Sequence, residues 1–456
     1  MFFDRRRGLT RRRQSLVAIA VAFAGFVVVI GIVGSLTTPD PIVSTTSLNQ
    51  PIGLNALAVD GTTGRVFIAT AGMYVTPPGV PRSHIDVFDS HSGSLQQVKE
   101  LGTGLALLTL DQRDGRVFVA DGSLAHPDKG EVYAFDAATG AVLRSVSISA
   151  IPSAIAADTR RGRIFVASMG MRSCGQGGCV SEPAVVDVLD ARTLHILRTT
   201  RVGPAPRTVV VDERSGRVFV NGSQGLDILD ASTGGVIRSM TGIARVLAVD
   251  QRTHRVFVMN YSGRVSMLDD VDGHSLGGVP FRGMPLFGEG SRAAADDLTG
   301  NVYILDSGRR TLSGPLVRPG GVAVVDGADG HIIRTISIGR LGTSPSAIVI
   351  DPESHRAFIA DIFANTVSVL DTQSGRVRSV IPVGLAHFAP QYIALDERTR
   401  HVIVESIETP GAGPPDAWAW IPSRIRAWLP FVPRRPPPPG SALPSTSVTV
   451  LDVARR

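Results

Sequence analysis

The chain has 456 residues and a formal net charge of +6, which is enough length for a large core. Residues 1–14 contain six arginines and one aspartate, a net of +5, so by subtraction the remaining residues carry only about +1. We therefore expect no nucleic-acid partner, because binding nucleic acid requires a basic face on the folded part.

The N-terminus predicts a membrane anchor. Two Arg triplets in residues 1–14 precede residues 15–36, a segment without any charged side chain. About 20 apolar residues span a bilayer as a helix, and flanking arginines stay in the cytoplasm. We predict a basic cytoplasmic tail over 1–14, a transmembrane helix over 15–36 and a linker over 37–41. The alternative is a signal peptide cleaved near residues 33–35, although its apolar region would exceed the usual length of about 15 residues.

A hairpin signature recurs through the rest of the chain. In "VVVDERSGRVFVN", residues 209–221, an apolar strand ends in Asp, a turn containing Gly follows, and a second apolar strand begins. Asp favours turns because its carboxylate accepts backbone N–H groups just downstream, and Gly tolerates positive φ. Eight copies align on this turn aspartate, each with a large apolar residue seven positions later. The turn aspartates are Asp60, Asp111, Asp158, Asp212, Asp250, Asp296, Asp351 and Asp396, and the apolar partners are Phe67, Phe118, Phe165, Phe219, Phe257, Tyr303, Phe358 and Ile403.

Each hairpin is followed by a third apolar strand ending in Asp and by a weaker fourth strand. The repeat length of roughly 40 to 55 residues is typical of propeller blades with four strands, here called a to d in chain order. The eighth repeat stops at Arg456 without a strand d, whereas "PIVSTTSLNQ" at 41–50 precedes the first repeat like a strand d without a blade. Because pairing the two removes both open sheet edges, we predict an all-β propeller over 42–456, with eight four-stranded blades closed by the N-terminal strand.

Residues 340–384, "RLGTSPSAIVIDPESHRAFIADIFANTVSVLDTQSGRVRSVIPVG", resemble the repeat of the YVTN or YncE-like bacterial β-propellers. The resemblance covers roughly residues 42–456, with long insertions, and it implies the fold much more specifically than a function. Members of this family usually have seven blades, so seven is the alternative to the eight counted here. Some propellers with similar blades are lactonases, lyases or dehydrogenases, so a propeller enzyme is the alternative function.

The sequence contains neither the catalytic motif of a serine hydrolase or a zinc protease nor a nucleotide-binding loop. Its ten histidines show no metal-ligand spacing. We therefore expect no catalytic residue, no cofactor and no metal. The two cysteines, Cys174 and Cys179 in "CGQGGC", predict a local disulfide in an oxidising compartment. The alternative is a metal site that recruits further ligands.

Ligand-binding residues are expected where the central channel opens, on the face that carries the d–a and b–c loops. Strand a of each blade begins there and strand b ends there, and long b–c loops in blades eight, one, two and three add a wall over one side. Arg207 and Arg245, in adjacent blades, suggest a small anionic ligand between them; the alternative is a water-filled channel with a polar lining. The predicted binding residues are Arg207, Arg245, Asn55, Ser153, Ser346, Gln391, Asp121, Asp306 and Asp361.

The last b–c loop contains a Pro-rich insertion, residues 409–444, which holds all three tryptophans of the chain, Trp418, Trp420 and Trp428. Exposed aromatic patches usually mark interaction sites, so we predict that this loop binds a protein partner or forms a lid. A plug over the channel and a membrane-interface segment are the alternatives.

The sequence as a whole predicts a binding module attached to the cell membrane through 15–36, with a cytoplasmic N-terminus and an extracytoplasmic propeller.

Overall fold

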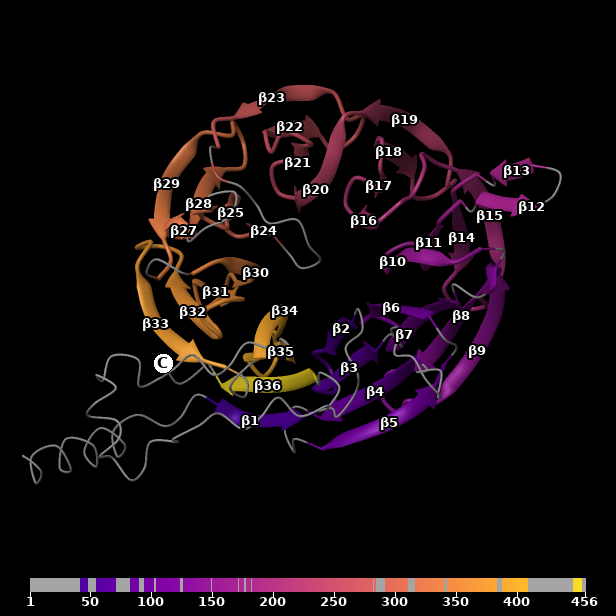
Figure 1. Ribbon diagram of the computed structural model, residues 1–456, viewed down its shortest axis with the longest axis horizontal. Helices are drawn as coiled ribbons and strands as arrows, with labels where there is room; N and C mark the ends of the chain where they lie inside the picture. Colours follow the sequence, from indigo (N-terminus) through magenta and orange to yellow (C-terminus); the bar gives the residue numbers. More distant parts are fainter. Residues whose placement is uncertain are drawn as a thin grey trace, which may run out of the picture.

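Each of the eight repeats folds into one four-stranded antiparallel sheet, and the sheets surround a central axis as propeller blades (Figure 1). The prediction of an all-β propeller with eight blades, rather than seven, is therefore confirmed. The computed structural model describes residues 42–47, 55–70, 83–89, 94–101, 104–123, 126–148, 150–170, 172–175, 178–181, 183–281, 283, 292–310, 316–339, 343–383, 388–408 and 446–452.

The strands follow the predicted order in every blade. Blades one to four contain β2 (Asn55–Asp60), β3 (Arg65–Thr70), β4 (His84–Asp89) and β5 (Leu95–Glu100); β6 (Gly104–Asp111), β7 (Arg116–Ser123), β8 (His126–Asp136) and β9 (Val142–Ile148); β10 (Pro152–Asp158), β11 (Arg163–Ser168), β14 (Val185–Asp190) and β15 (Ile196–Arg201); and β16 (Thr208–Asp212), β17 (Arg217–Asn221), β18 (Gly225–Asp230) and β19 (Val236–Thr241).

Blades five to seven contain β20 (Ile243–Asp250), β21 (Arg255–Asn260), β22 (Val265–Asp269) and β23 (Ser275–Val279); β24 (Ala293–Asp296), β25 (Asn301–Asp306), β28 (Gly321–Asp326) and β29 (Ile332–Ser337); and β30 (Pro345–Asp351), β31 (Arg356–Asp361), β32 (Thr366–Asp371) and β33 (Val377–Pro382). The eighth sheet has the order β1 (Ile42–Ser47), β36 (Thr446–Asp452), β35 (His401–Glu408) and β34 (Phe388–Asp396). In that sheet β1 pairs antiparallel with β36, with Ile42 opposite Leu451 and Ser47 opposite Ser447.

Two b–c connections form small hairpins of their own. In blade three, β12 (Arg172–Gly175) pairs with β13 (Gly178–Ser181), and in blade six, β26 (Arg309–Arg310) pairs with β27 (Leu316–Arg318). The first hairpin places the Cα atoms of Cys174 and Cys179 directly opposite each other. The side chains of both cysteines lie outside the described part of the structure, so the disulfide stays a prediction.

The core lies between neighbouring blades. Eight clusters of buried apolar side chains each join two consecutive blades, and the cluster between blades eight and one packs Val450 against the blade-one strands. The apolar partner seven residues after each turn aspartate is fully buried in all eight blades. The d strands, such as β19, form the outer rim of the ring and are mostly exposed (Figure 1). Burial therefore falls from the b and c strands to the rim, because those strands are covered on both faces.

The turn aspartates are structural. All eight are at most 1% exposed, and each begins the tight turn between strands a and b. Asp212, for example, accepts the N–H groups of Arg214 at 2.9 Å and Ser215 at 3.3 Å through Oδ1. A residue with positive φ closes each turn, a glycine in five blades and His254, His355 or Arg400 in the other three. The repeated Asp and Gly are thus explained by turn geometry.

The predicted tail, anchor and linker, residues 1–41, lie outside the described residues, as does the insertion 409–444. Within the described ranges, no helix has the length and apolar character needed to cross a membrane.

Candidate functional site

Strand pairing brings the predicted binding positions to one face of the ring. Ala106 at the start of strand a lies opposite Asp121 at the end of strand b, and Pro345, the neighbour of Ser346, lies opposite Asp361. We call this the loop face, because the d–a and b–c loops leave the blades here. The opposite face carries the turn aspartates and is called the turn face.

The predicted polar residues of the loop face have different environments. Arg207 is exposed, and its backbone N–H donates to the Asn221 oxygen at 2.8 Å. Ser153 is half-buried, and its Oγ donates to the Ala167 oxygen at 3.2 Å. Gln391 is half-buried, and the side chain of Asn55 lies outside the description. These positions share a face, but they are not equally placed to hold a ligand.

Arg292, which is absent from the predicted set, is a buried arginine on this face. It immediately precedes β24 and is only 5% exposed. Burial and the charge of Arg245 lower the pKa of Arg292 to about 10, while Tyr392 acts in the opposite direction. Two arginines from neighbouring blades are therefore close enough to repel each other, and one of them is buried.

Hydrogen bonds connect Arg292 to blades seven and eight. Its Nη1 donates to the main-chain oxygen of Ser346 in blade seven. The Ser346 hydroxyl, fully buried, donates to the Pro390 oxygen of blade eight at 3.0 Å. Arg245 of blade five and Tyr392 of blade eight influence Arg292 electrostatically, and we call these residues together the Arg292 cluster. Among the described residues no carboxylate pairs with the Arg292 guanidinium, and its Nε is buried without a hydrogen-bond partner.

The three predicted acidic residues of the loop face are buried, between 1% and 5% exposed. Asp306 accepts a charged hydrogen bond from Arg318 of β27 and an N–H from Gly308 at 3.1 Å. Asp361 accepts the N–H groups of Ala364 at 2.8 Å and Phe363 at 3.0 Å, while burial raises its pKa. Asp306 and Asp361 therefore organise their own b–c turns. Asp121 is also buried and lies opposite Glu131 on β8.

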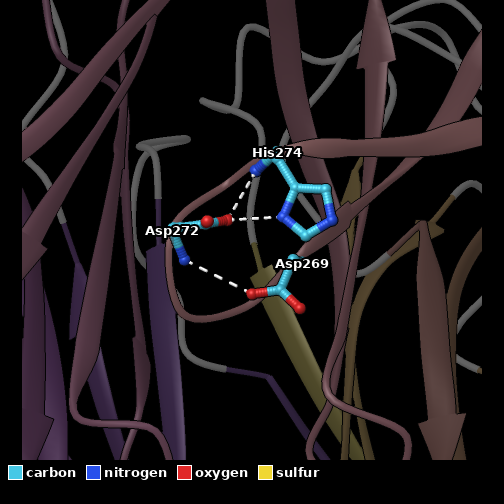
Figure 2. A group of neighbouring side chains, drawn as sticks. All are labelled: Asp269, Asp272 and His274. Carbon is cyan, nitrogen blue, oxygen red and sulfur yellow. Dashed lines mark hydrogen bonds and ion pairs between the residues drawn. The ribbon is translucent and has the colours of Figure 1, made fainter.

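Two groups on the turn face contain metal-ligand side chains that the sequence prediction missed. The motif D-x-x-D-G-H occurs in the c–d turns of blades five and six, as "DDVDGH" at 269–274 and "DGADGH" at 326–331. Figure 2 shows the first: Asp269, Asp272 and His274 converge, and their candidate ligand atoms lie within 4.8 Å of one another. The second group, Asp326, Asp329 and His331, has the same property.

Hydrogen bonds within each group account for its shape. His274 Nδ1 lies 2.7 Å from Asp272 Oδ1, which also accepts the His274 backbone N–H at 2.9 Å (Figure 2). In blade two the place of Asp272 is taken by Thr139, whose hydroxyl donates to Asp136. A carboxylate cannot make that donation. In blade five Asp269 instead accepts the backbone N–H groups of Val271 at 2.9 Å and Asp272 at 3.4 Å, while the His274 ring bonds Asp272. The nitrogen and oxygen donors could hold a divalent metal, but the second Asp and the His of each group are exposed, and the closed hydrogen bonds explain the arrangement without one.

Comparisons with known proteins support the fold. No protein-family model matches the chain, and neither does any curated protein. Among solved structures, the chain is similar to the computationally designed Ika8 protein, with a TM-score of 0.56 and 15% identity over 80% of this chain and 96% of that chain. Sqt1 of Saccharomyces cerevisiae gives 0.54 and 10% over 80% and 96%, and a europium-containing methanol dehydrogenase gives 0.53 and 12% over 90% and 93%. At such low identities these likenesses show the fold alone.

Trp418, Trp420 and Trp428, predicted to bind a partner, lie outside the described residues. The structure therefore describes the loop face without them, and the Arg292 cluster lies within the described part of this face.

Proposed function

We propose that the chain is a membrane-anchored, extracytoplasmic propeller of the YVTN or YncE-like kind that binds an anionic ligand on its loop face. The observation that carries the proposal is the burial of Arg292, whose guanidinium has no carboxylate partner among the described residues. A buried charge is costly unless it is paired, and the positive charge of Arg245 adds to that cost. A ligand carboxylate or phosphate that reaches the Arg292 guanidinium would supply the negative charge that Arg292 lacks.

The chemistry of the cluster favours an oxyanion. Guanidinium groups bind carboxylate and phosphate through paired hydrogen bonds, and the Nε of Arg292 has an unused donor. Tyr392 is a further electrostatic neighbour of Arg292. The proposed role is recognition, because the cluster contains two arginines, a tyrosine and a serine that already donates to Pro390. It lacks a nucleophile next to a general base.

Calorimetric titration of the full-length chain in neutral detergent, with citrate and sulfate as probes, tests the proposal. We expect binding that weakens about tenfold or more in Arg292→Met and Arg245→Met, since each removes a charge-assisted contact. Arg264→Met is the matched control, because Arg264 is an exposed arginine in the b–c turn of blade five. Equal affinities in all four proteins, or no binding at all, would reject the site. Arg207→Met reports whether Arg207 reaches the same ligand.

The remaining parts of the proposal concern attachment and partners. Residues 15–36 anchor the protein, the N-terminal strand closes the ring, and the insertion 409–444 captures a protein partner through Trp418, Trp420 and Trp428. The support is the uncharged segment in the sequence, the pairing of β1 with β36, and the concentration of every tryptophan in one loop. A reporter fused after Arg456 should be active only outside the cytoplasm.

A propeller enzyme is the second candidate, and Asp361 is the observation that favours it. Burial raises the pKa of this loop-face carboxyl group, and carboxyl groups with raised pKa values serve as general acids in many enzymes. Turnover of a lactone, sugar-acid or alcohol substrate that disappears in Asp361→Asn would favour catalysis over recognition.

A further inference from the structure

A second basic site lies on the turn face, between blades two and three. A pocket of about 430 Å³ is lined by Arg116, Ala134, Leu143, Arg144, Arg192 and Thr193. Arg116 begins β7, Leu143 and Arg144 belong to β9, and Arg192 and Thr193 stand in the c–d turn of blade three. Its volume is within the range of about 300–1,000 Å³ usual for small-molecule sites.

The lining combines three guanidinium groups with no acidic side chain. Arg116 Nη1 donates to the Ala191 oxygen at 3.0 Å. Within the described residues, the guanidinium groups of Arg144 and Arg192 take part in no hydrogen bond or ion pair, and the only bond of Arg192 is made by its backbone N–H to Asp190. Three like charges around one cavity repel each other, and the lining contains no negative charge that would balance them.

The other blades show what Arg144 would do in a purely structural role. It stands eight residues after the aspartate that ends strand c, and Arg198, Arg238 and Arg334 occupy the same place in blades three, four and six. Each of these three donates to a main-chain oxygen in the next blade's c–d turn: Arg198 to Thr233 at 3.4 Å, Arg238 to Asp272 at 3.3 Å and Arg334 to Gln373 at 3.3 Å.

Blade two departs from this pattern. The equivalent acceptor for Arg144 is the main-chain oxygen of Thr193, yet this bond is not formed among the described residues, and Arg144 borders the pocket instead. The residue just before Thr193 is Arg192, where the next two blades have Ser232 and Val271. Among the four described blades that carry the repeated arginine, blade two alone lacks the bridge, and an additional cation, Arg192, stands at its junction with blade three.

We propose that this pocket binds the phosphate group of an organic phosphate. A phosphate monoester carries close to two negative charges and a phosphodiester carries one, and both offer several acceptor oxygens. Either can bridge Arg116, Arg144 and Arg192 and reduce their mutual repulsion. Leu143 and Ala134 form an apolar wall for the carbon part of the ligand. The phosphate can belong to a soluble metabolite or to a lipid headgroup, and both present anionic phosphate oxygens to the arginines.

Native mass spectrometry of the full-length chain in neutral detergent separates the two sources. One arm adds glycerol 3-phosphate, and the other adds phosphatidylglycerol with zwitterionic phosphatidylcholine as the comparison of zero net charge. We expect at least one arm to show a bound phosphate compound whose occupancy falls about tenfold in Arg192→Ser and in Arg144→Ala. Binding should also weaken as salt rises, because the pocket is open to solvent.

Arg238→Ala is the matched control, because it removes an arginine from the same repeat position in a blade where the guanidinium bridges to the next turn. The basic tail at 1–14 attracts anionic lipid in every variant, so the difference between variants is the measurement. Loss in Arg144→Ala and Arg192→Ser with retention in Arg238→Ala supports the site, and the responding arm identifies the source. Equal occupancy in all variants, or no binding in either arm, overturns the proposal.

Discussion

Replacing Arg292 with methionine should make the unliganded protein more stable while it removes anion binding. The guanidinium is only 5% exposed, and burial together with Arg245 lowers its pKa to about 10. An arginine with a lowered pKa holds its charge in the folded state at a free-energy cost. Below pH 10 that cost is present in full, and it fades as the pH rises above the folded-state pKa. Methionine has a similar length and no charge.

The magnitude follows from the pKa. An arginine's usual value is about 12.5, so a folded-state value of about 10 corresponds to roughly 3 kcal/mol, at about 1.4 kcal/mol per unit. The substitution also removes the hydrogen bond from Arg292 to the Ser346 oxygen, which contributes about 1 kcal/mol. We therefore expect Arg292→Met to raise the free energy of unfolding by about 2 kcal/mol at pH 7.

Thermal unfolding at a fixed scan rate, with and without sulfate, measures both effects. Wild type should gain stability with sulfate through binding to the folded state, whereas Arg292→Met should start higher and gain little. Arg264→Met, an exposed substitution on the same face, should behave as wild type. If Arg292→Met is instead less stable than wild type and sulfate stabilises both proteins equally, Arg292 is a paired structural cation and the reasoning fails.

Three further predictions concern the scaffold. Deleting residues 42–47 should lower the thermal midpoint by several degrees, because β36 would become an open edge; an unchanged midpoint would exclude a closing role for β1. Asp270→Asn should raise the free energy of unfolding at pH 7 and raise it less at pH 4. Burial, together with Asp212, raises the Asp270 pKa, so the ionised form is penalised as the pH rises; an equal change at both pH values in urea titrations would contradict this. His355 has a φ of 54°, so His355→Gly should relieve backbone strain and stabilise the protein by about 1 kcal/mol. His254 has a φ of 60°, but its Nδ1 bonds the buried Asp270 at 2.9 Å, so His254→Gly should destabilise the protein. Shifts of the thermal midpoint in the same direction for both variants would contradict this difference.

The fold could be predicted from the sequence because the repeat encodes local and tertiary structure together. An aspartate begins every turn and a residue with positive φ closes it, a glycine in five blades, and the residue seven positions after the aspartate reaches the core in every blade. The spacing is rigid because strands alternate faces with a period of two, so a single insertion would turn the aromatic side chain away from the core. The number of these Asp-containing turns in the sequence therefore equals the number of blades.

The candidate sites could be predicted only in part. The sequence prediction selected Arg245 but missed Arg292, which immediately precedes β24 and whose charge interacts with that of Arg245. In the sequence Arg144 and Arg238 hold the same repeat position, yet only Arg238 bridges to the next blade. These differences depend on which side chains come into contact between neighbouring blades. The repeat pattern does not show those contacts, because the residues that make them are far apart in the sequence.

The two basic sites lie on opposite faces of the ring, and the direction of β1 relates each face to the proposed anchor. Strand c ends on the turn face, where Ile42 lies opposite Leu451 of β36, so the chain enters the propeller from that side. A linker over 37–41 reaches at most about 18 Å. An anchor at 15–36 would thus hold the turn face and its Arg144 pocket towards the lipid headgroups, and the Arg292 cluster would face away from the membrane. This favours the lipid as the source of the phosphate. It also leaves the loop face open to a soluble ligand, because that face would point away from the membrane.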